Sequence, residues 1–456
     1  GSRGRGNLSS TANPYFLFPQ IYNFRYNIYS SEWPVANRAI ELYLQKKSEN
    51  EGWERQINGL SNNEKANLLL EKHTFKELLA DVEQRNLQNN IVGLEASRLF
   101  ARSEINMGVD AFRDSLYAML KRNTFLNIKF ENMLDTLGEM SRTDLYSYLK
   151  EWEQLTPLPF YSIGEPELTK VVNKGGEEFF VLKVLVSNNS DYDGIIQMNV
   201  LQNGWWYQPM EDPRARKKVE IAAHTSKEFV SVWEEQIRDV EINTMVSGNL
   251  PYMIRQSIGN VKQERNKIVK DTIYTLPESS LEMPGEVIVD NEDSTLFVLS
   301  TPAVVGLLPK WLDKVEDTSF KYSGISWWRA PLQWTATTNA KYYGKYIRSA
   351  YVIKSGDGSQ TATWKIPVPE AGQYELYYHV FKDDELRWND RLQGEYHFRV
   401  AYDSEMEDAY INLRKANEGW EQLGTYYFSA DTVRVVLTDE CKLRSVTADA
   451  VKIVKR

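Results

Sequence analysis

The apolar positions follow two different periods along the chain, a helical period first and a strand-like period afterwards. In the first third of the sequence, apolar residues recur three and four positions apart, which is the spacing of amphipathic helices. The clearest stripe contains Phe112, Leu116, Met119 and Leu120. Pro157 and Pro159 close this region, because proline does not continue a helix. The pattern predicts a helical domain over residues 33–160, after an extended lead-in over residues 1–32.

Polar residues with capping spacing predict where individual helices begin. Thr74 and Glu77 stand three positions apart, as in a capping box, and we expect a long helical stretch to follow them. The apolar residues of that stretch are Leu78, Leu79, Val82, Ile91, Leu94 and Leu99. Ser141 together with Asp144 predicts the start of the last helix of this domain.

Beyond the two prolines, short apolar runs separated by turn residues predict strands. Residues 179–186 form an almost continuous apolar run, which indicates a buried strand. Further strands are predicted at residues 195–201, 217–221, 229–233 and 240–245. Strands at this spacing are typical of an immunoglobulin-like β-sandwich, here over residues 165–258. The polar residues 259–285, with Pro277 and Pro284, are predicted to be a linker.

The last region, residues 286–456, alternates apolar and polar positions again. The clearest alternating set is Tyr374, Leu376, Tyr378 and Val380. Such a set occupies one face of a strand. The predicted fold class is therefore a multidomain α+β protein with an N-terminal helical domain, a middle immunoglobulin-like β-sandwich and a C-terminal β jelly roll.

Composition and charge narrow the function classes. The chain has 456 residues, enough for about two to four domains. Its net charge is −9, divided into −5 before residue 286 and −4 after it, so no part of it is the basic surface of a nucleic-acid-binding protein. Cys441 is the single cysteine, which excludes an intrachain disulfide and a cysteine-based zinc cluster. The glycine-rich start, residues 1–6, is typical of a flexible linker, and we expect the chain to be part of a longer protein.

The sequence carries no motif of a known catalytic centre. None of its four histidines stand four positions apart, as zinc-binding histidines on a helix do. A nucleophile elbow, a phosphate-binding loop and a dinucleotide-binding fingerprint are also missing. Spacing does not select a catalytic pair among 63 acidic residues. We therefore expect a non-catalytic chain without a cofactor, and keep a polysaccharide lyase-type enzyme as an alternative.

Eight short segments of the C-terminal region follow one another in a specific order. They are Val289–Asp293, Tyr351, Gly356–Gly358, Ala362–Trp364, Pro369–Tyr377, Gly419–Trp420, Leu423–Phe428 and Val446–Val451. In this order they resemble the golvesin and xanthan-lyase C-terminal-like domain. The resemblance implies a jelly-roll module of an exported bacterial protein, of a kind described as carbohydrate-binding-like, and a periplasmic, cell-surface or extracellular location. Residues 310–348 form a longer insertion than the family leads us to expect, so the loops need not bind as those of relatives do.

The helical region is similar, over fewer residues, to the part that follows the active site in aminopeptidase N-type gluzincin peptidases. The similar segments are Phe112–Tyr117, Asn123, Phe130–Leu134, Ser141–Leu145, Trp152 and Pro159. Such enzymes hold zinc with a His-Glu-x-x-His motif, which this sequence lacks. The resemblance therefore implies no catalytic residue here, and it suggests that the chain accompanies a metallopeptidase-like domain that lies outside it.

Aromatic residues are concentrated near the C-terminus. Seven of the 13 tryptophans and 13 of the 26 tyrosines lie between Trp311 and Tyr427. The apolar face of a sugar stacks on such rings while polar neighbours orient its hydroxyls, and binding pockets combine these two elements. The candidate glycan-binding residues are Trp327, Trp328, Arg329, Trp334, Tyr342, Tyr343, Asp384, Arg387 and Trp388. The alternative is burial, which we expect for Trp364 and Trp420 because both border regular strands.

Two acidic residues at the start of the last domain have the oxygen ligands that calcium prefers. They are Asp290 and Asp293. The spaced ligand pattern of a calcium loop is missing, so a turn is the favoured interpretation and no metal is expected.

These observations predict a non-catalytic part of a larger exported bacterial protein that binds glycan or a cell-envelope polymer through its C-terminal jelly roll. Its partners would be a polysaccharide or glycan and other domains of the same protein. No nucleic acid is expected, and a membrane only through segments outside this chain. The first alternative is a structural or assembly scaffold that braces a missing domain.

Overall fold

The computed structural model describes most of the chain after residue 25. The described residues are 26–45, 51–155, 157–201, 212–259, 261–265, 269–279, 281, 285–300, 320–325, 329–382, 394–403 and 405–456. They divide into two compact units. The first contains the described residues up to 45 and those within 62–248 and 252–279. The second contains the described residues within 51–61, 249–251 and 281–456. The expectation of a multidomain α+β chain with a helical N-terminal region is confirmed.

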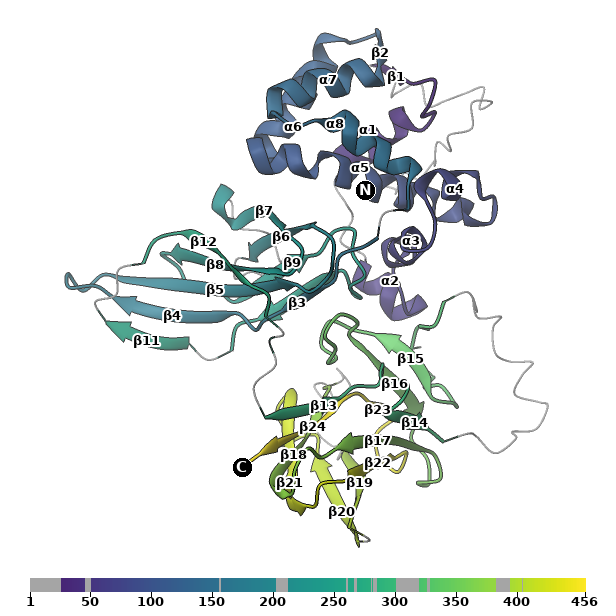
Figure 1. Cartoon of the computed structure of the whole chain (residues 1–456), viewed down its shortest axis with the longest axis vertical. Helices are drawn as coiled ribbons and strands as arrows, with labels where there is room; N and C mark the ends of the chain where they lie inside the picture. The colour runs from purple at the N-terminus through teal and green to yellow at the C-terminus, as the bar shows by residue number, and fades with distance from the viewer. Residues whose placement is uncertain are drawn as a thin grey trace, which may run out of the picture. The chain divides into compact units, whose positions relative to one another are not determined.

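The helices of the first unit pack around one long central helix, α5 (Figure 1). They are α1 (Ala36–Leu44), α3 (Asn62–Leu70), α4 (Phe75–Ala80), α5 (Gln88–Met107), α6 (Val109–Arg122), α7 (Phe130–Ser141) and α8 (Leu145–Lys150). The apolar stripe of α6 is buried, with Phe112 and Leu116 fully inaccessible. Two short strands, β1 (Asn27–Tyr29) and β2 (Asn127–Lys129), pair in parallel beside the helices. None of the helices among the described residues is long and apolar enough to cross a membrane.

Local polar contacts divide the long helical stretch that was predicted after Thr74. The capping box of Thr74 and Glu77 is present at the start of α4. Asp81 then leaves the helical conformation and accepts a hydrogen bond from the Glu83 amide, and the short 3₁₀ helix η2 (Glu83–Asn86) precedes α5. Val82 is consequently 68% exposed rather than part of an apolar face.

The start of the last helix also differs from the prediction. Asp144 alone caps α8, where its side chain accepts a hydrogen bond from the Ser147 amide. Ser141 is the buried last residue of α7, and its hydroxyl donates to the Leu137 carbonyl one turn earlier. The 3₁₀ helix η3 (Glu151–Glu153) follows α8 and ends the helical part.

The other strands described in the first unit, β3 to β12, form two larger sheets. One has the order β10-β9-β6-β7, and the other has the order β11-β4-β5-β8-β12 with β3 also on β5. The strands are β3 (Tyr161–Ile163), β4 (Glu167–Val172), β5 (Glu178–Asn188), β6 (Gly194–Leu201), β7 (Arg216–Ile221), β8 (Thr225–Trp233), β9 (Asp239–Asn243), β10 (Met253–Ser257), β11 (Val261–Arg265) and β12 (Thr272–Pro277). Apolar residues of both sheets, among them Val184, Ile196 and Phe229, share one core. The immunoglobulin-like type of this β-sandwich stays a prediction.

Two strands lie in the segment that was predicted to be a linker. β11 pairs in parallel with β4, and β12 pairs antiparallel with β8. Both strands are at sheet edges, and most of their residues are exposed or only half-buried. Their sequences therefore lack the apolar face by which strands are recognised.

The second unit is a β-structure that also contains one helix from the N-terminal region, α2 (Glu51–Asn58). Its sheets have the orders β13-β24-β18-β21, β14-β17-β22-β19-β20 and β15-β16-β23. The strands are β13 (Glu286–Val289), β14 (Phe297–Leu299), β15 (Thr335–Thr338), β16 (Ser349–Lys354), β17 (Thr361–Pro367), β18 (Gly372–Val380), β19 (Glu395–Tyr402), β20 (Glu405–Asn412), β21 (Gly419–Phe428), β22 (Thr432–Thr438), β23 (Ser445–Ala448) and β24 (Val451–Lys455).

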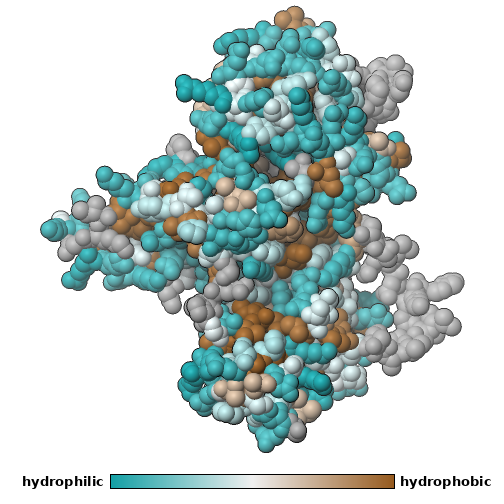
Figure 2. Space-filling view, in the orientation of Figure 1, coloured by the Kyte–Doolittle hydropathy of each residue, from teal (hydrophilic) through white to brown (hydrophobic). Residues whose placement is uncertain are grey.

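One apolar core joins the two larger sheets of this unit. Trp364 of β17, Tyr378 of β18 and Phe398 of β19 are fully buried in it, and the expected burial of Trp364 is thus observed. The jelly-roll connectivity stays a prediction. On the visible face of this unit, apolar surface gathers over β13 in a largely hydrophilic surround (Figure 2).

Candidate functional site

The register of three strands places aromatic and charged side chains together on the outer face of the sheet β13-β24-β18-β21. Along β18, Tyr378 and Val380 are buried in the core, so Tyr377 and His379 lie on the opposite face. His379 is paired with Trp420 of β21, and Tyr377 is paired with Lys452 of β24. Directly paired residues share a face, and these four therefore form one surface. We call them, together with Tyr343, the outer-face cluster.

The rings of the outer-face cluster are in direct contact. The ring centroids of His379 and Trp420 are 5.1 Å apart with the planes nearly perpendicular. The Tyr343 ring lies 5.0 Å from Trp420 and 5.8 Å from His379. The Lys452 ammonium lies 4.9 Å from the Trp420 centroid and 5.3 Å from that of Tyr377, which are cation–π distances. Lys452 is also ion-paired with Glu286 of β13 at 2.7 Å.

A buried carboxylate beneath the cluster fixes two of its members. Asp449, which lies between β23 and β24, is 0% exposed. Its Oδ2 is 2.8 Å from His379 Nδ1 and accepts the Tyr343 amide hydrogen at 3.1 Å. An ionised Asp449 requires the proton on Nδ1, so His379 Nε2 is left to interact with other groups. Burial raises the pKa of Asp449, and the neighbouring His379 partly opposes this rise.

A second acidic group lies close to Asp449. Burial, together with Asp449, raises the pKa of Asp290 well above its ordinary value. The neighbouring Glu292 accepts hydrogen bonds from Lys321 Nζ at 2.6 Å and Tyr322 Oη at 3.1 Å. Asp290 and Asp449 are thus two neighbouring buried carboxyl groups, and burial is the main cause of the raised pKa of both.

The other calcium candidate, Asp293, has a turn function. Its Oδ1 accepts hydrogen bonds from the Thr295 amide at 3.0 Å, the Thr295 hydroxyl at 2.7 Å and the Leu296 amide at 3.2 Å. The Thr295 side chain is the main cause of its lowered pKa. Within the described residues no three acidic, histidine or cysteine side chains converge as metal ligands.

The structure brings one of the nine predicted glycan-binding residues into the outer-face cluster, Tyr343. Its neighbour Tyr342 is 6% exposed and packs on Phe381 at 4.8 Å, so its ring is part of the interior. Trp334 is half-buried against the core, and Arg329 is exposed. The remaining five, Trp327, Trp328, Asp384, Arg387 and Trp388, lie outside the described residues.

Four members of the cluster were not predicted. Trp420 was expected in the core, but it is only half-buried and lies on the outer face. The alternation that assigned Tyr378 to the core also assigned Tyr377 and His379 to the other face, and this signal was present in the sequence. Lys452 had no such signal, because its place depends on the pairing of β24 with β18.

The comparisons with known proteins bear on the second unit. Residues 328–455 match the golvesin C-terminal domain family. Over these residues the chain is similar to that domain, and we call residues 328–455 the golvesin-type domain. The predicted resemblance to golvesin is confirmed, while that to xanthan lyase stays a prediction, and the whole outer-face cluster falls within the matched residues. No curated protein matches the chain in sequence. The resemblance of the helical part to aminopeptidases stays a prediction.

Among solved structures the similarities are distant. The Bacteroides uniformis beta-glucuronidase is 11% identical, with 69% of this chain and 32% of that chain covered and a TM-score of 0.19. The Bacteroides uniformis beta-glucuronidase 2 bound to cyclophellitol-6-carboxylate aziridine is 11% identical, with 68% and 31% covered and a TM-score of 0.19. A chain of the Sulfolobus Turreted Icosahedral Virus structure is 10% identical, with 65% of this chain and 92% of that chain covered and a TM-score of 0.13. The chain thus spans about a third of the two glucuronidases, and similarities at these TM-scores support no argument about fold or function.

Proposed function

We propose that the golvesin-type domain binds a glycan or cell-envelope polymer through the outer-face cluster, as a non-catalytic part of a larger exported bacterial protein. The observation that supports this proposal most is the contact of Trp420 and Tyr343 with His379, whose ring is held by the buried Asp449. Aromatic surface and an oriented polar group thus lie side by side, which is the combination that sugar recognition requires.

The chemistry of each member suits a sugar. Trp420 and Tyr343 offer ring surface to the apolar face of a pyranose. His379 Nε2 accepts a hydrogen bond from a sugar hydroxyl when the ring is neutral. The Lys452 ammonium, paired with Glu286 at 2.7 Å and with a side chain only 12% exposed, supports the Trp420 ring by a cation–π contact at 4.9 Å.

The predicted loop residues extend the proposal. Trp388 follows His379 by nine positions in the sequence, just after the end of β18. We include Trp388 with Asp384 and Arg387, and Trp327 with Trp328 and Arg329, as further contacts to the polymer.

A glycan array followed by calorimetry on the full chain tests the proposal. Trp420→Ala should weaken binding of the selected glycan by at least about tenfold, because stacking and hydrogen bonds of this kind contribute roughly 1–3 kcal/mol. The matched control is Tyr427→Ala, which removes an aromatic ring of the same strand that is 64% exposed and outside the cluster. Tyr427→Ala should leave binding unchanged.

Two outcomes would contradict the proposal. If no glycan or cell-envelope polymer binds the wild-type chain, the scaffold alternative replaces it. If Trp420→Ala and Tyr427→Ala weaken binding equally while both variants remain folded by circular dichroism, the binding surface lies elsewhere on the domain.

A further inference from the structure

A cavity of about 380 Å³ lies inside the first unit, where the helical part meets the β-sandwich. Arg98 and Arg102 of α5 and Glu151 of η3 line one side of it. Residues 191–194, in the turn between β5 and β6, line the other side. The volume is within the range of small-ligand pockets, about 300–1,000 Å³.

The lining has more carboxylates than cations. The ionisable lining residues are Glu95, Arg98, Arg102, Glu151, Asp191 and Asp193. Four acidic groups thus face two guanidinium groups in the lining, while His224, outside the lining, pairs with one of the four, Asp191, at 2.8 Å. A cleft with an excess of one sign attracts ligands of the opposite sign.

Both guanidinium groups are already neutralised by the protein. Arg98 lies 3.4 Å from Glu95 and 3.0 Å from Glu151. Arg102 lies 2.7 Å from Glu220, and its guanidinium covers the ring of Tyr148 at 4.4 Å. These pairs leave little attraction for an anionic ligand, so the cavity does not have the chemistry of a phosphate or carboxylate site.

Glu95 is a buried carboxyl group whose hydrogen bonds only partly offset the cost of removing its charge from water. Its residue is 2% exposed, and its hydrogen bond from Arg98 is long, at 3.4 Å. Burial raises its pKa, and the opposing effects of Arg98 and Trp152 are smaller. Buried carboxyl groups at a cavity wall are costly to keep, and perturbed ones cluster at functional sites. A ligand ammonium group would supply a further donor at this position.

The lining also contains the aromatic ring of a tyrosine. Tyr192, in the turn between β5 and β6, is 46% exposed and belongs to the lining. Such a ring packs against an alkyl chain or attracts a cation to its face. The cavity therefore combines an acidic wall with an exposed ring.

We propose that this cavity binds a ligand with a primary ammonium group, either a small alkylamine or the lysine side chain of a peptide. Glu95 and Glu151 accept hydrogen bonds from the ammonium group, and Tyr192 contacts the carbon chain. The site belongs to the first unit and is independent of the glycan-binding proposal.

Calorimetry on the full chain at low ionic strength tests the proposal with cadaverine and with the dipeptide Lys-Lys as probes. Glu151→Gln and Glu95→Gln should each weaken binding of at least one probe by about tenfold or more. The matched control is Glu153→Gln: Glu153 is two residues from Glu151, has a side chain that is 55% exposed, and is paired with Lys76 at 3.0 Å outside the lining. This variant should bind as the wild type does. The ε-acetylated dipeptide should lose affinity, because its side chains carry no charge.

The two probes also separate the two sources of the ammonium group, since a peptide site favours Lys-Lys over cadaverine. The proposal is overturned if neither probe binds the wild type, or if Glu151→Gln and Glu153→Gln reduce binding equally, which would indicate general attraction to an acidic surface. Binding of glutarate in place of the amines would also overturn it. Because Glu151 has a side chain that is 38% exposed, its variant should fold even if Glu95→Gln does not.

Discussion

At the scale of single residues, Asp449 orients a residue of the site, but burying its charge reduces the stability of the fold. The carboxylate is fully buried and orients His379, yet burial raises its pKa, so its charged form is less favourable in the folded than in the unfolded chain. One oxygen, Oδ2, accepts both the His379 Nδ1 proton and the Tyr343 amide hydrogen. An asparagine whose amide oxygen takes this position would keep both hydrogen bonds without the charge.

We therefore expect Asp449→Asn to separate stability from binding. A group with a raised folded pKa stabilises the protein below its unfolded value, near 3.8, and this contribution is lost as the pH rises through the folded value. Wild-type stability should thus decline over this window more than that of Asp449→Asn, as measured by urea unfolding at acidic and neutral pH. Glycan affinity should fall by roughly tenfold in the variant, because His379 loses its charged partner.

Asp408→Asn is the matched control for this prediction. Asp408 pairs with His397 at 2.9 Å, but its side chain is 58% exposed, so its replacement should change the unfolding free energy by less than about 0.5 kcal/mol. An equal pH dependence of wild type and Asp449→Asn would show that the buried carboxylate carries no such cost.

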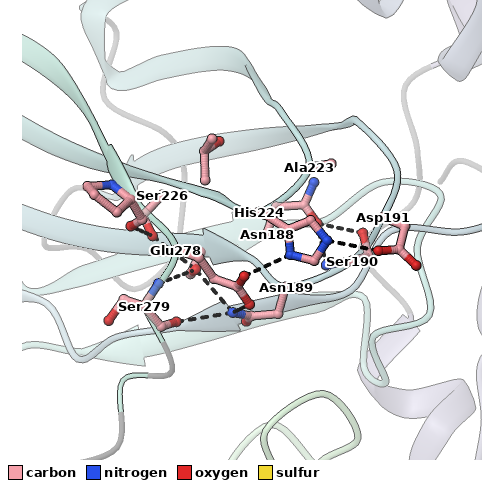
Figure 3. A network of polar contacts seen from close by, with 12 residues as sticks. Asn188, Asn189, Ser190, Asp191, Ala223, His224, Ser226, Glu278 and Ser279 are labelled. Atoms are coloured by element: carbon pink, nitrogen blue, oxygen red, sulfur yellow. Dashed lines mark hydrogen bonds and ion pairs between the residues drawn. The ribbon is translucent and has the colours of Figure 1, made fainter.

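At the scale of elements, polar contacts join the loops that follow β5 and β7 to the residues after β12. His224 follows β7 with a positive φ of 53°, and its ring lies between Asp191 at 2.8 Å and Glu278 at 2.7 Å (Figure 3). Asn189 donates to the Glu278 carboxylate and to the Ser279 carbonyl. These contacts hold the last residues of the first unit, directly after β12.

We expect the His224 contacts to depend on pH. The Asp191 and Glu278 side chains raise the pKa of His224. Their stabilising effect should be fully present below the unfolded value, 6.5, and should be lost as the pH rises through the folded value. His224→Asn, which tolerates the same positive φ, should remove this part of the pH dependence of unfolding.

An NMR titration of the His224 ring checks the direction directly, and His73→Asn serves as a control for the loss of an exposed histidine. Protection of the amides of residues 277–279 against hydrogen exchange should decline over the same pH range in the wild type. A His224 pKa at or below 6.5 would contradict the prediction.

At the scale of the whole molecule, the units do not follow the order of the chain. Helix α2, from the N-terminal region, belongs to the second unit, although α1 and α3 belong to the first. The Gly59 carbonyl after α2 accepts a hydrogen bond from Thr338 Oγ1 at 2.8 Å. A β-carbon on Gly324 would lie 1.8 Å from the Ile57 carbonyl oxygen, so the backbone of α2 packs directly against this glycine.

Gly324→Ala should therefore destabilise the second unit by roughly 1–3 kcal/mol, because the clash is with backbone atoms and not with the end of a flexible side chain. Thermal unfolding combined with hydrogen exchange of β15 and α2 measures the effect. Gly372→Ala is the matched control, since its β-carbon would meet at 3.1 Å only the flexible end of Lys455. Equal effects of the two substitutions would indicate that α2 is not a structural part of this unit.

The sequence by itself determined the properties that depend on neighbouring positions. The stripe of α6, the capping box of Thr74 and the alternation of β18 are each set by residues within a few positions of one another, and each is present in the structure. The order of the short segments was likewise sufficient to indicate the similarity to golvesin, and seven of the eight lie within the matched residues 328–455. Features that depend only on residues close together in the sequence can therefore be predicted from one sequence.

Only the tertiary structure decided what depends on contacts between distant positions. Edge strands β11 and β12 lack an apolar face, so nothing in their own residues distinguished them from a linker. The pairing of β18 with β21 and β24 placed Trp420 and Lys452 beside His379. The connection between β23 and β24 placed the Asp449 carboxylate next to the His379 ring. These contacts join residues about 40 to 75 positions apart, and their energies depend on burial that exists only once the sheets have packed.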